Sequence, residues 1–250
     1  MSKPKTKDEL QNHRNQAITS FDSYIESLIN SSNEKDNSKA DKLCYWINDW
    51  KNFLSYEPQF NPIKLKRYKR GEIIKVHLGF NVGSEEGGLH YAVVIENDNP
   101  KSSPVLTIVP LTSVKCKHDE LNLLPGTIYL GNDLYSSLTL KITTISQNVT
   151  KQVEKLEKLI IENAIDSKLL KKFQADINDL KKELIFLDRM SKESQKMKKG
   201  SIALVNQITT ISKIRIYDPK INHDILSGIK LSPENMDKID SEIIKRYTHK

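Results

Sequence analysis

One histidine of the chain stands where it could move a proton. His90 directly follows a glycine-rich loop, residues 81–88 (NVGSEEGG), and precedes the apolar run 91–95. The ordinary pKa of an imidazole, about 6.5, lets it act as acid or base near neutral pH. Glycine permits positive φ and close approach of the backbone to a bound group, which is what a loop over a ligand needs. The competing interpretation is a polar residue tolerated at the start of a strand.

Other catalytic chemistries find no matching motif in the sequence. His77, His118 and His223 are scattered, and none lies at metal-ligand spacing from another histidine, cysteine or carboxylate, so we expect no metal and no other cofactor. The chain lacks the nucleophile elbow, the P-loop and the dinucleotide-binding fingerprint. Its two cysteines, Cys44 and Cys116, are too few for a disulfide framework or a zinc site.

Length and charge set broad limits on the class of protein. The 250 residues suit one large domain or two small ones, and the formal net charge is +7. Residues 135–200 carry 14 basic and 9 acidic side chains, so most of the positive excess lies there. The sequence contains no run of about 18 apolar residues and no apolar segment after its polar N-terminus, so we expect a cytoplasmic protein without a membrane span.

The first sixty residues have the apolar periodicity of two amphipathic helices. One apolar face spans 17–29 and a second spans 43–54, each with steps of three and four residues. A polar stretch at 31–38 separates them. Because so small a pair of helices rarely stands alone, we expect residues 1–62 to form a helical extension that packs beside the rest of the chain.

After Gly71 the pattern changes to short, β-branched runs separated by turn residues. Such runs predict an antiparallel sheet or a small barrel. A long helical stretch interrupts the series, and a final helix begins at Ser232-Pro233, with proline at its first position. The predicted strands are 73–78, 91–95, 105–109, 127–130, 201–205 and 211–217.

The helical stretch between the two groups of strands has a heptad pattern. Its apolar residues alternate steps of three and four, which is typical of a coiled-coil seam. A shorter stripe at 149–160 matches it, and 163–167 can turn the chain. We predict an antiparallel helical hairpin over 141–197 that packs on itself or on a second copy. Its lysines are interpreted as a solvated surface, with nucleic-acid binding as the alternative. The heptad residues are Leu170, Phe173, Ile177, Leu180, Leu184 and Leu187.

Three stretches form a recognisable pattern when they are taken in order. They are 70–88, which contains RGEII and GSEEGG, then 108–113 (IVPLTS), and then 201–211 (SIALVNQITTI). Together they resemble the MazF/PemK family of toxin ribonucleases. The closing helix at 234–240 is similar to that family's C-terminal helix.

The resemblance implies an α+β fold built on a small, strongly curved antiparallel β-barrel of the MazF/PemK/CcdB type. This barrel would be formed by residues 63–140 and 198–250, and members of the family are usually homodimers. The helices of 1–62 and the hairpin of 141–197 lie outside the compact family pattern. They are interpreted as additions found in longer relatives.

The resemblance also implies an activity and its partners. The family cleaves single-stranded RNA without a metal: the ribose 2′-hydroxyl attacks the adjacent phosphorus and leaves a 2′,3′-cyclic phosphate and a 5′-hydroxyl. An acidic antitoxin protein usually occupies the substrate groove. The reaction needs a base at the 2′-hydroxyl, an acid at the 5′-oxygen and donors for the phosphorane.

Carried over residue by residue, the resemblance marks a candidate catalytic set. His90 stands where compact relatives carry a catalytic arginine, and it could perform the proton transfer itself. Thr112 matches the family's catalytic threonine, and Ser113 beside it offers a second donor to the phosphate. Ser84 lies in the loop and could hydrogen-bond the scissile phosphate. Glu85 is interpreted as an acceptor that stabilises the loop.

The later matching positions carry fewer charges than the family pattern. Asn206 stands where relatives have an acidic residue, and Thr209 stands where an arginine is common. Asn206 and Gln207 are nonetheless expected to contact RNA. The basic residues left in the matching segments, which could grip phosphates or simply be solvated, are Arg70, Lys213 and Arg215.

Two other functions are compatible with the same sequence. CcdB-like proteins use the same barrel to poison DNA gyrase by binding it, and the loss of charge at positions 90, 206 and 209 is what that function would expect. The other alternative is a catalytically degenerate interaction protein that recruits its partner through the helical hairpin.

Overall fold

The computed structural model describes residues 5–114, 123–162 and 167–249. Cys116, His118 and residues 163–166 of the predicted turn at 163–167 lie outside these residues. The chain forms two compact units, 1–58 and 59–250, which we describe separately.

The first unit consists of two helices of equal length. α1 (Lys7–Ile29) begins with a capping box, in which the Thr6 hydroxyl accepts from the Glu9 backbone and the Glu9 carboxylate accepts from Thr6. α2 (Glu34–Tyr56) begins after Asn33, whose side chain accepts from the backbone N–H of Lys35. Among the described residues 5–58, the buried side chains are Leu28, Ala40 and Leu43, which make a small core.

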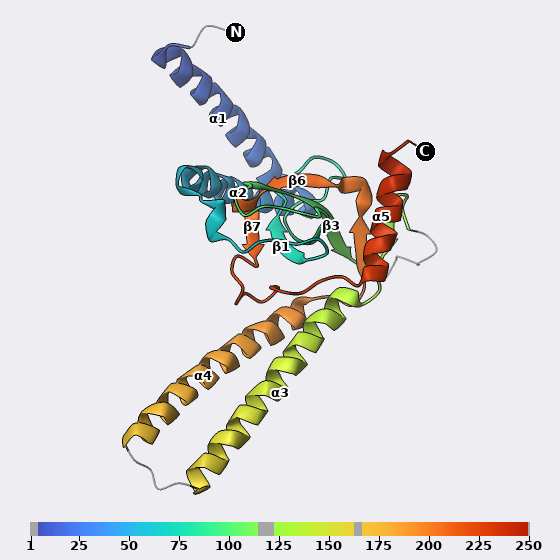
Figure 1. Cartoon of the computed structure of the whole chain (residues 1–250). Coiled ribbons are helices and arrows are strands. Elements are labelled where there is room, and N and C mark those ends of the chain that lie inside the picture. Colours follow the sequence, from blue (N-terminus) through green and yellow to red (C-terminus); the bar gives the residue numbers. More distant parts are fainter. Residues whose placement is uncertain (1–4, 115–122, 163–166, 250) are drawn as a thin grey trace. The chain divides into compact units, whose positions relative to one another are not determined.

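The second unit is built on one antiparallel sheet (Figure 1). The strands follow the order β4-β5-β3-β2-β1-β7, and β6 also pairs with β3. The long strand β3 has β2 on one side, while β5 and β6 share its other side. The strands are β1 (Ile73–His77), β2 (Leu89–Val94), β3 (Val105–Ser113), β4 (Thr127–Tyr129), β5 (Ser201–Leu204), β6 (Thr209–Ser212) and β7 (Ile216–Asp218).

The α+β class and the antiparallel sheet are confirmed, but the sheet is open. In the part of the chain that the structure describes, the end strands β4 and β7 do not pair with each other, so no closed barrel forms. Each of these strands has only three residues, which leaves short outer edges. A short edge offers few unpaired backbone groups, so an open sheet of this kind needs no closure to protect it.

Both faces of the sheet are buried, because successive side chains of a strand point to opposite faces. One face packs against the helices through a cluster that includes Val93, Leu111, Leu134, Met190 and Ile239. The opposite face carries a second cluster that includes Ile74, Val76, Ala92, Ile108 and Ile211. A side chain of a strand is therefore exposed to solvent only where no other residues pack on its face of the sheet.

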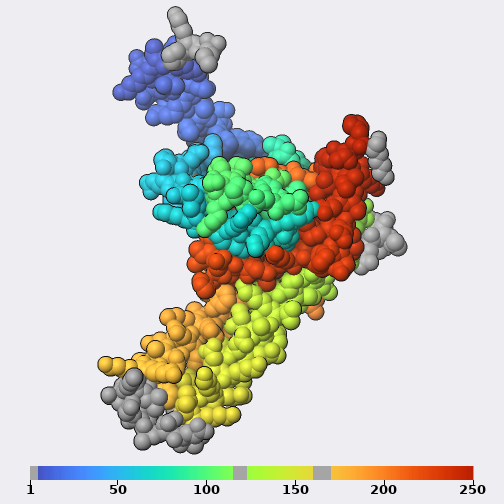
Figure 2. Space-filling view, in the orientation of Figure 1, coloured from blue at the N-terminus to red at the C-terminus, as the bar shows by residue number. Residues whose placement is uncertain are grey.

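Two thirty-residue helices interrupt the sheet between β4 and β5. α3 (Asp133–Glu162) and α4 (Ser167–Lys196) lie in contact along their length (Figures 1 and 2). α3 begins at 133, earlier than the predicted start at 141. Of the six heptad residues on α4, Phe173 and Leu180 are buried and Leu187 is half-buried, whereas Leu170, Ile177 and Leu184 are exposed. The two helices thus bury only part of the heptad seam.

A partly buried ion pair ties the end of α4 to the sheet. Glu193 accepts hydrogen bonds from the Lys75 ammonium of β1 and from the Tyr91 hydroxyl of β2, the latter at 2.5 Å. The side chains of Lys75 and Glu193 are 18% and 13% exposed. Burial alone would raise the pKa of Glu193, but the two hydrogen bonds outweigh it and lower that pKa. The last turn of α4 is therefore held at a defined place on the sheet.

The start of α3 is tied to the C-terminal helix α5 (Pro233–Tyr247). The Asp133 carboxylate accepts from the backbone N–H of Ser232, the N-cap of α5, and from the Asn235 amide, at 2.7 and 2.9 Å.

Among the described residues, no helix combines the length and the apolar character that a membrane span requires.

Candidate active site

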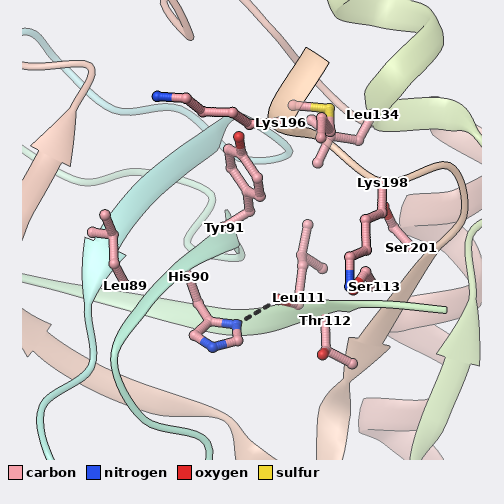
Figure 3. Close-up of a pocket in the computed structure, with 11 residues that line it drawn as sticks. Leu89, His90, Tyr91, Leu111, Thr112, Ser113, Leu134, Lys196, Lys198 and Ser201 are labelled. Carbon is pink, nitrogen blue, oxygen red and sulfur yellow. Dashed lines mark hydrogen bonds between the residues drawn. The ribbon is translucent and has the colours of Figure 1, made fainter. Parts of the chain in front are cut away.

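The two residues that the sequence places at the centre of the chemistry become neighbours on the sheet. The register of β2 and β3 pairs Tyr91 with Leu111, so His90 and Thr112 follow opposite each other at the next position. Figure 3 shows that the side chains of His90 and Thr112 extend to one side of the two strands, while those of Tyr91 and Leu111 extend to the other. Two distant segments thus present an imidazole and a hydroxyl side by side.

His90 is held by an acceptor at each ring nitrogen. Its Nε2 lies 2.9 Å from the Glu86 carboxylate, and its Nδ1 lies 3.3 Å from the carbonyl oxygen of Leu111. The His90 and Glu86 side chains are 26% and 25% exposed, so the pair is largely shielded from water. The hydrogen bond to Glu86 raises the pKa of His90, and it outweighs burial, which would lower that pKa. Two acceptors favour the imidazolium, because only that form donates from both nitrogens.

Glu86 is a residue that the sequence does not distinguish from its neighbour. The loop contains two consecutive glutamates, and the sequence pattern assigns a role to Glu85 only. Glu86 precedes His90 by four positions, but the intervening glycines give no helical or strand period from which a contact could be inferred. The path of the loop alone selects Glu86 as the partner of the imidazole.

Gln207 holds this loop in place. Its side-chain oxygen accepts from the Glu86 backbone N–H at 2.6 Å, and its side-chain nitrogen donates to the Ser84 carbonyl at 3.2 Å. Asn81 closes the loop from within by donating to the Glu86 carbonyl at 2.7 Å. A Cβ on Gly87 would lie 2.9 Å from the Gly79 carbonyl oxygen, so the close crossing of the loop requires glycine there. Gln207 therefore acts on the loop backbone, and Ser84 lies exposed within the segment it holds.

A hollow of about 390 Å³ lies beside the loop, and we call it the loop groove. Arg215 brings a guanidinium to it, anchored by a hydrogen bond of 2.8 Å from Nε to the His77 carbonyl. Burial lowers the pKa of Arg215. The groove is lined by Glu86, the partner of His90, and by four residues that the sequence predicts to contact RNA: Glu85, Asn206, Gln207 and Arg215. Its lining is Leu78, Asn81, Glu85, Glu86, Pro110, Asn206, Gln207, Ile208, Thr209, Ile211 and Arg215.

A second hollow, of about 190 Å³, lies at the ends of β2 and β3 where α4 returns to the sheet, and we call it the strand-end pocket (Figure 3). Ser113, a predicted RNA contact, lies in it. The last residues of the helical insertion also contribute, and the sequence pattern does not indicate them. The lining is Leu89, His90, Tyr91, Leu111, Thr112, Ser113, Leu134, Lys196, Met197, Lys198 and Ser201.

Two basic residues predicted to bind RNA lie elsewhere. Lys213 is buried, donates to the Pro100 carbonyl at 3.1 Å and lies 5.8 Å from the centre of the Tyr68 ring, so its ammonium does not face the loop groove. Arg70 pairs with Asp240 of α5 and donates to the Ile95 carbonyl, beyond the end of β2 opposite to His90. Both side chains make contacts within the fold, away from the loop groove.

A family comparison covers the part of the chain that contains His90 and Thr112. No curated protein matches the chain. Residues 69–173 match the model of a family described as the PemK-like, MazF-like toxin of type II toxin–antitoxin systems. This range includes β1 to β4, the loop of Glu86 and α3, and it ends within α4. This match supports the resemblance found in the sequence: over residues 69–173 the chain is similar to the PemK-like, MazF-like toxins.

Proposed function

We propose that the protein is a toxin that cleaves single-stranded RNA without a metal, by attack of the ribose 2′-hydroxyl on the adjacent phosphorus. The observation that carries this proposal is the pair of His90 and Glu86 beside Thr112 on one face of the sheet. A carboxylate and an imidazolium within hydrogen-bond distance of each other are a base and an acid of the kind that the reaction needs.

The proposed reaction uses these two groups in sequence. Glu86 takes the proton of the 2′-hydroxyl, while a bond forms between the 2′-oxygen and phosphorus. His90 gives a proton to the 5′-oxygen as the bond between phosphorus and that oxygen breaks. The products are a 2′,3′-cyclic phosphate and a 5′-hydroxyl, so atoms and charges balance. Bound RNA would have to separate the two side chains, which are 2.9 Å apart in the free protein.

The remaining groups would hold the charge of the phosphate and the strand. The hydroxyls of Thr112 and Ser84 would donate to the phosphorane oxygens, and Ser113 would contact the neighbouring nucleotide. Arg215 offers a planar pair of donors at the floor of the loop groove, suited to a flanking phosphate. Glu85 and Asn206 line the same groove and would contact the sugar or base.

The proposed function brings two protein partners with it. An acidic antitoxin would compete with RNA for the loop groove, because carboxylates suit the same Arg215 that binds phosphate. A second copy of the chain would complete a homodimer, as the family resemblance implies. We place this toxin in the cytoplasm, where its RNA substrate and the antitoxin occur together.

We expect the purified chain to cut a mixed-sequence single-stranded RNA in the presence of EDTA. The cut ends should carry a 2′,3′-cyclic phosphate and a 5′-hydroxyl, which mass spectrometry of the fragments identifies. Intact RNA, or cleavage that EDTA abolishes, would contradict the proposal. Intact RNA together with capture of DNA gyrase would favour the non-catalytic CcdB-like alternative.

The pH profile should depend on Glu86. Because Glu86 raises the pKa of His90, Glu86→Gln should lower that pKa, and the loss of activity at alkaline pH should begin at a lower pH than in the wild type. The rate should also fall at every pH, because the variant removes the proposed base. Rates of RNA cleavage measured from pH 4 to 9 test both effects. Glu85→Gln is the matched control, and it should leave the alkaline limb in place.

A further inference from the structure

The strand-end pocket has the composition of a small-ligand site. Its walls are apolar, formed by the side chains of Leu89, Tyr91, Leu111, Leu134 and Met197. Polar side chains border this apolar space, as they do around many bound ring systems. They are the hydroxyl side chains of Ser113 and Ser201 and the lysine side chains of Lys196 and Lys198.

The polar groups are placed in two sets with different chemistry. Ser113 and Ser201 are direct cross-strand partners of β3 and β5, so their hydroxyls lie next to each other on one face. A pair of hydroxyls can donate and accept, which suits the edge of a nucleobase. Lys196 and Lys198 are exposed at the end of α4, where an ammonium group can meet a phosphate without being buried.

The position of the pocket relates it to the candidate active site. His90 and Thr112 border the pocket through their strands, while their side chains extend to the other side (Figure 3). A nucleotide in the pocket would therefore lie at the same strand ends as a phosphate held by His90 and Thr112. Proteins that recognise single-stranded RNA bind splayed-out bases against aromatic and apolar side chains. Tyr91 and Met197 provide such a wall.

We propose that the strand-end pocket binds one nucleotide of the RNA substrate, and that the last turn of the helical insertion helps to select its base. The proposal rests on the proposed function, because it takes the substrate to be RNA. It assigns the base to the apolar space beside Tyr91 and Met197, the base edge to Ser113 and Ser201, and the phosphate to Lys196 and Lys198. The ion pair of Lys75 with Glu193 holds α4 in position for this contact.

The test measures binding of the four ribonucleoside 5′-monophosphates to the full chain by calorimetry. We expect one base to bind best. Lys198→Ala should weaken all four nucleotides by about tenfold, because it removes a charge-assisted contact to phosphate. Ser113→Ala should reduce the preference between bases by about tenfold while retaining the phosphate contribution. Circular dichroism melting identifies any variant that fails to fold, and Ser201→Ala, which removes the other hydroxyl of the pair, then replaces Ser113→Ala.

Lys192→Ala is the matched control for the lysine variant. Lys192 also lies on α4 and is paired with Asp188 on the exposed surface, outside the pocket lining. Its substitution removes the same charge and should change nucleotide affinity less than twofold. An equal loss with Lys192→Ala and Lys198→Ala, or absence of nucleotide binding, would overturn the proposal. The proposal would also be overturned if RNA displaced no bound nucleotide while an acidic peptide bound tightly in the pocket.

The outcomes also separate this proposal from the proposed function. RNA cleavage without nucleotide binding would overturn the pocket assignment and leave the ribonuclease standing. Nucleotide binding that responds to Lys198→Ala and Ser113→Ala, in a chain that leaves RNA intact, would support the pocket and overturn the ribonuclease. Comparing the cut sites of wild type and Ser113→Ala on one RNA adds a readout of base selection.

Discussion

His90→Ala is expected to lower the rate of RNA cleavage by about 10²- to 10⁴-fold, the range over which a positioned general acid contributes. The alanine removes the proton donor and leaves Glu86 without the partner that lies 2.9 Å from its carboxylate. Binding of RNA should change far less, because the hydroxyl of Thr112 and the guanidinium of Arg215 remain. Single-turnover cleavage and a separate binding measurement distinguish the two effects.

Two further histidine variants make this result specific. His223→Ala removes an imidazole from an exposed position outside both hollows and should cleave at the wild-type rate. His90→Arg restores a positive charge with donors but not an acid that titrates near neutral pH, so its rate should lose the alkaline limb that His90 produces. Equal cleavage by the wild type and His90→Ala would remove His90 from the mechanism.

Glu193→Ala is expected to destabilise the second unit by about 3 kcal/mol, the lower end of the cost of breaking a buried ion pair from one side, because this pair is partly buried. The substitution leaves the partly buried Lys75 ammonium beside the Tyr91 ring, 5.4 Å from its centre, without the carboxylate that now accepts from it. It also removes the acceptor of the Tyr91 hydroxyl. Urea unfolding followed by tyrosine fluorescence and circular dichroism measures the loss.

The choice of signal matters because the chain has two compact units. Both tryptophans, Trp46 and Trp50, lie in the first unit. The unfolding transition followed by tryptophan fluorescence should therefore have the same urea midpoint in the wild type and the variant. Asp188→Ala is the control for surface charge. It breaks a pair with side chains 66% and 58% exposed and should cost less than about 1 kcal/mol. A similar small cost for Glu193→Ala would show that the ion pair does not hold α4.

The same ion pair should make stability depend on pH in one direction. The folded-state pKa of Glu193 lies below its ordinary value of 4.5, so its ionised form stabilises the folded chain at higher pH. This contribution is complete above the unfolded pKa and is lost as the pH falls through the folded pKa. The difference in stability between wild type and Glu193→Ala should therefore shrink below pH 4.5.

Local patterns in the sequence determined the elements of the fold. The six predicted strands correspond to β1 to β7, because a 3-10 turn at Lys213–Arg215 divides the predicted strand 211–217 into β6 and β7. The periods of three and four correspond to α1 to α5 among the described residues. The start of α5 is the same in the sequence prediction and in the structure, with proline at the first position and Ser232 as the N-cap. These features follow from residues that are close together in the chain, because backbone preference, capping and amphipathic spacing are local properties.

The tertiary structure decided which of these side chains meet. The choice of Glu86 over Glu85 as the partner of His90, and the use of Gln207 to hold the loop, depend on a crossing of the loop with a segment more than a hundred residues away. The burial of Lys213 depends on Tyr68 and Pro100, which no local pattern connects to it. The family resemblance places His90 and Thr112 in one site, but only strand register makes them neighbours.

Local periodicity indicates neither that the sheet is open nor that the end of α4 contributes to the strand-end pocket. Sequence periodicity shows that a strand exists and which of its residues share a face, but not which edge pairs with which. Likewise, the heptad on α4 does not indicate that Lys196, Met197 and Lys198 return to the ends of β2 and β3. Periodicity indicates contacts between residues that are close together in the sequence. The candidate site is made of contacts between residues that are far apart in the sequence, and the packing of the whole sheet determines these contacts.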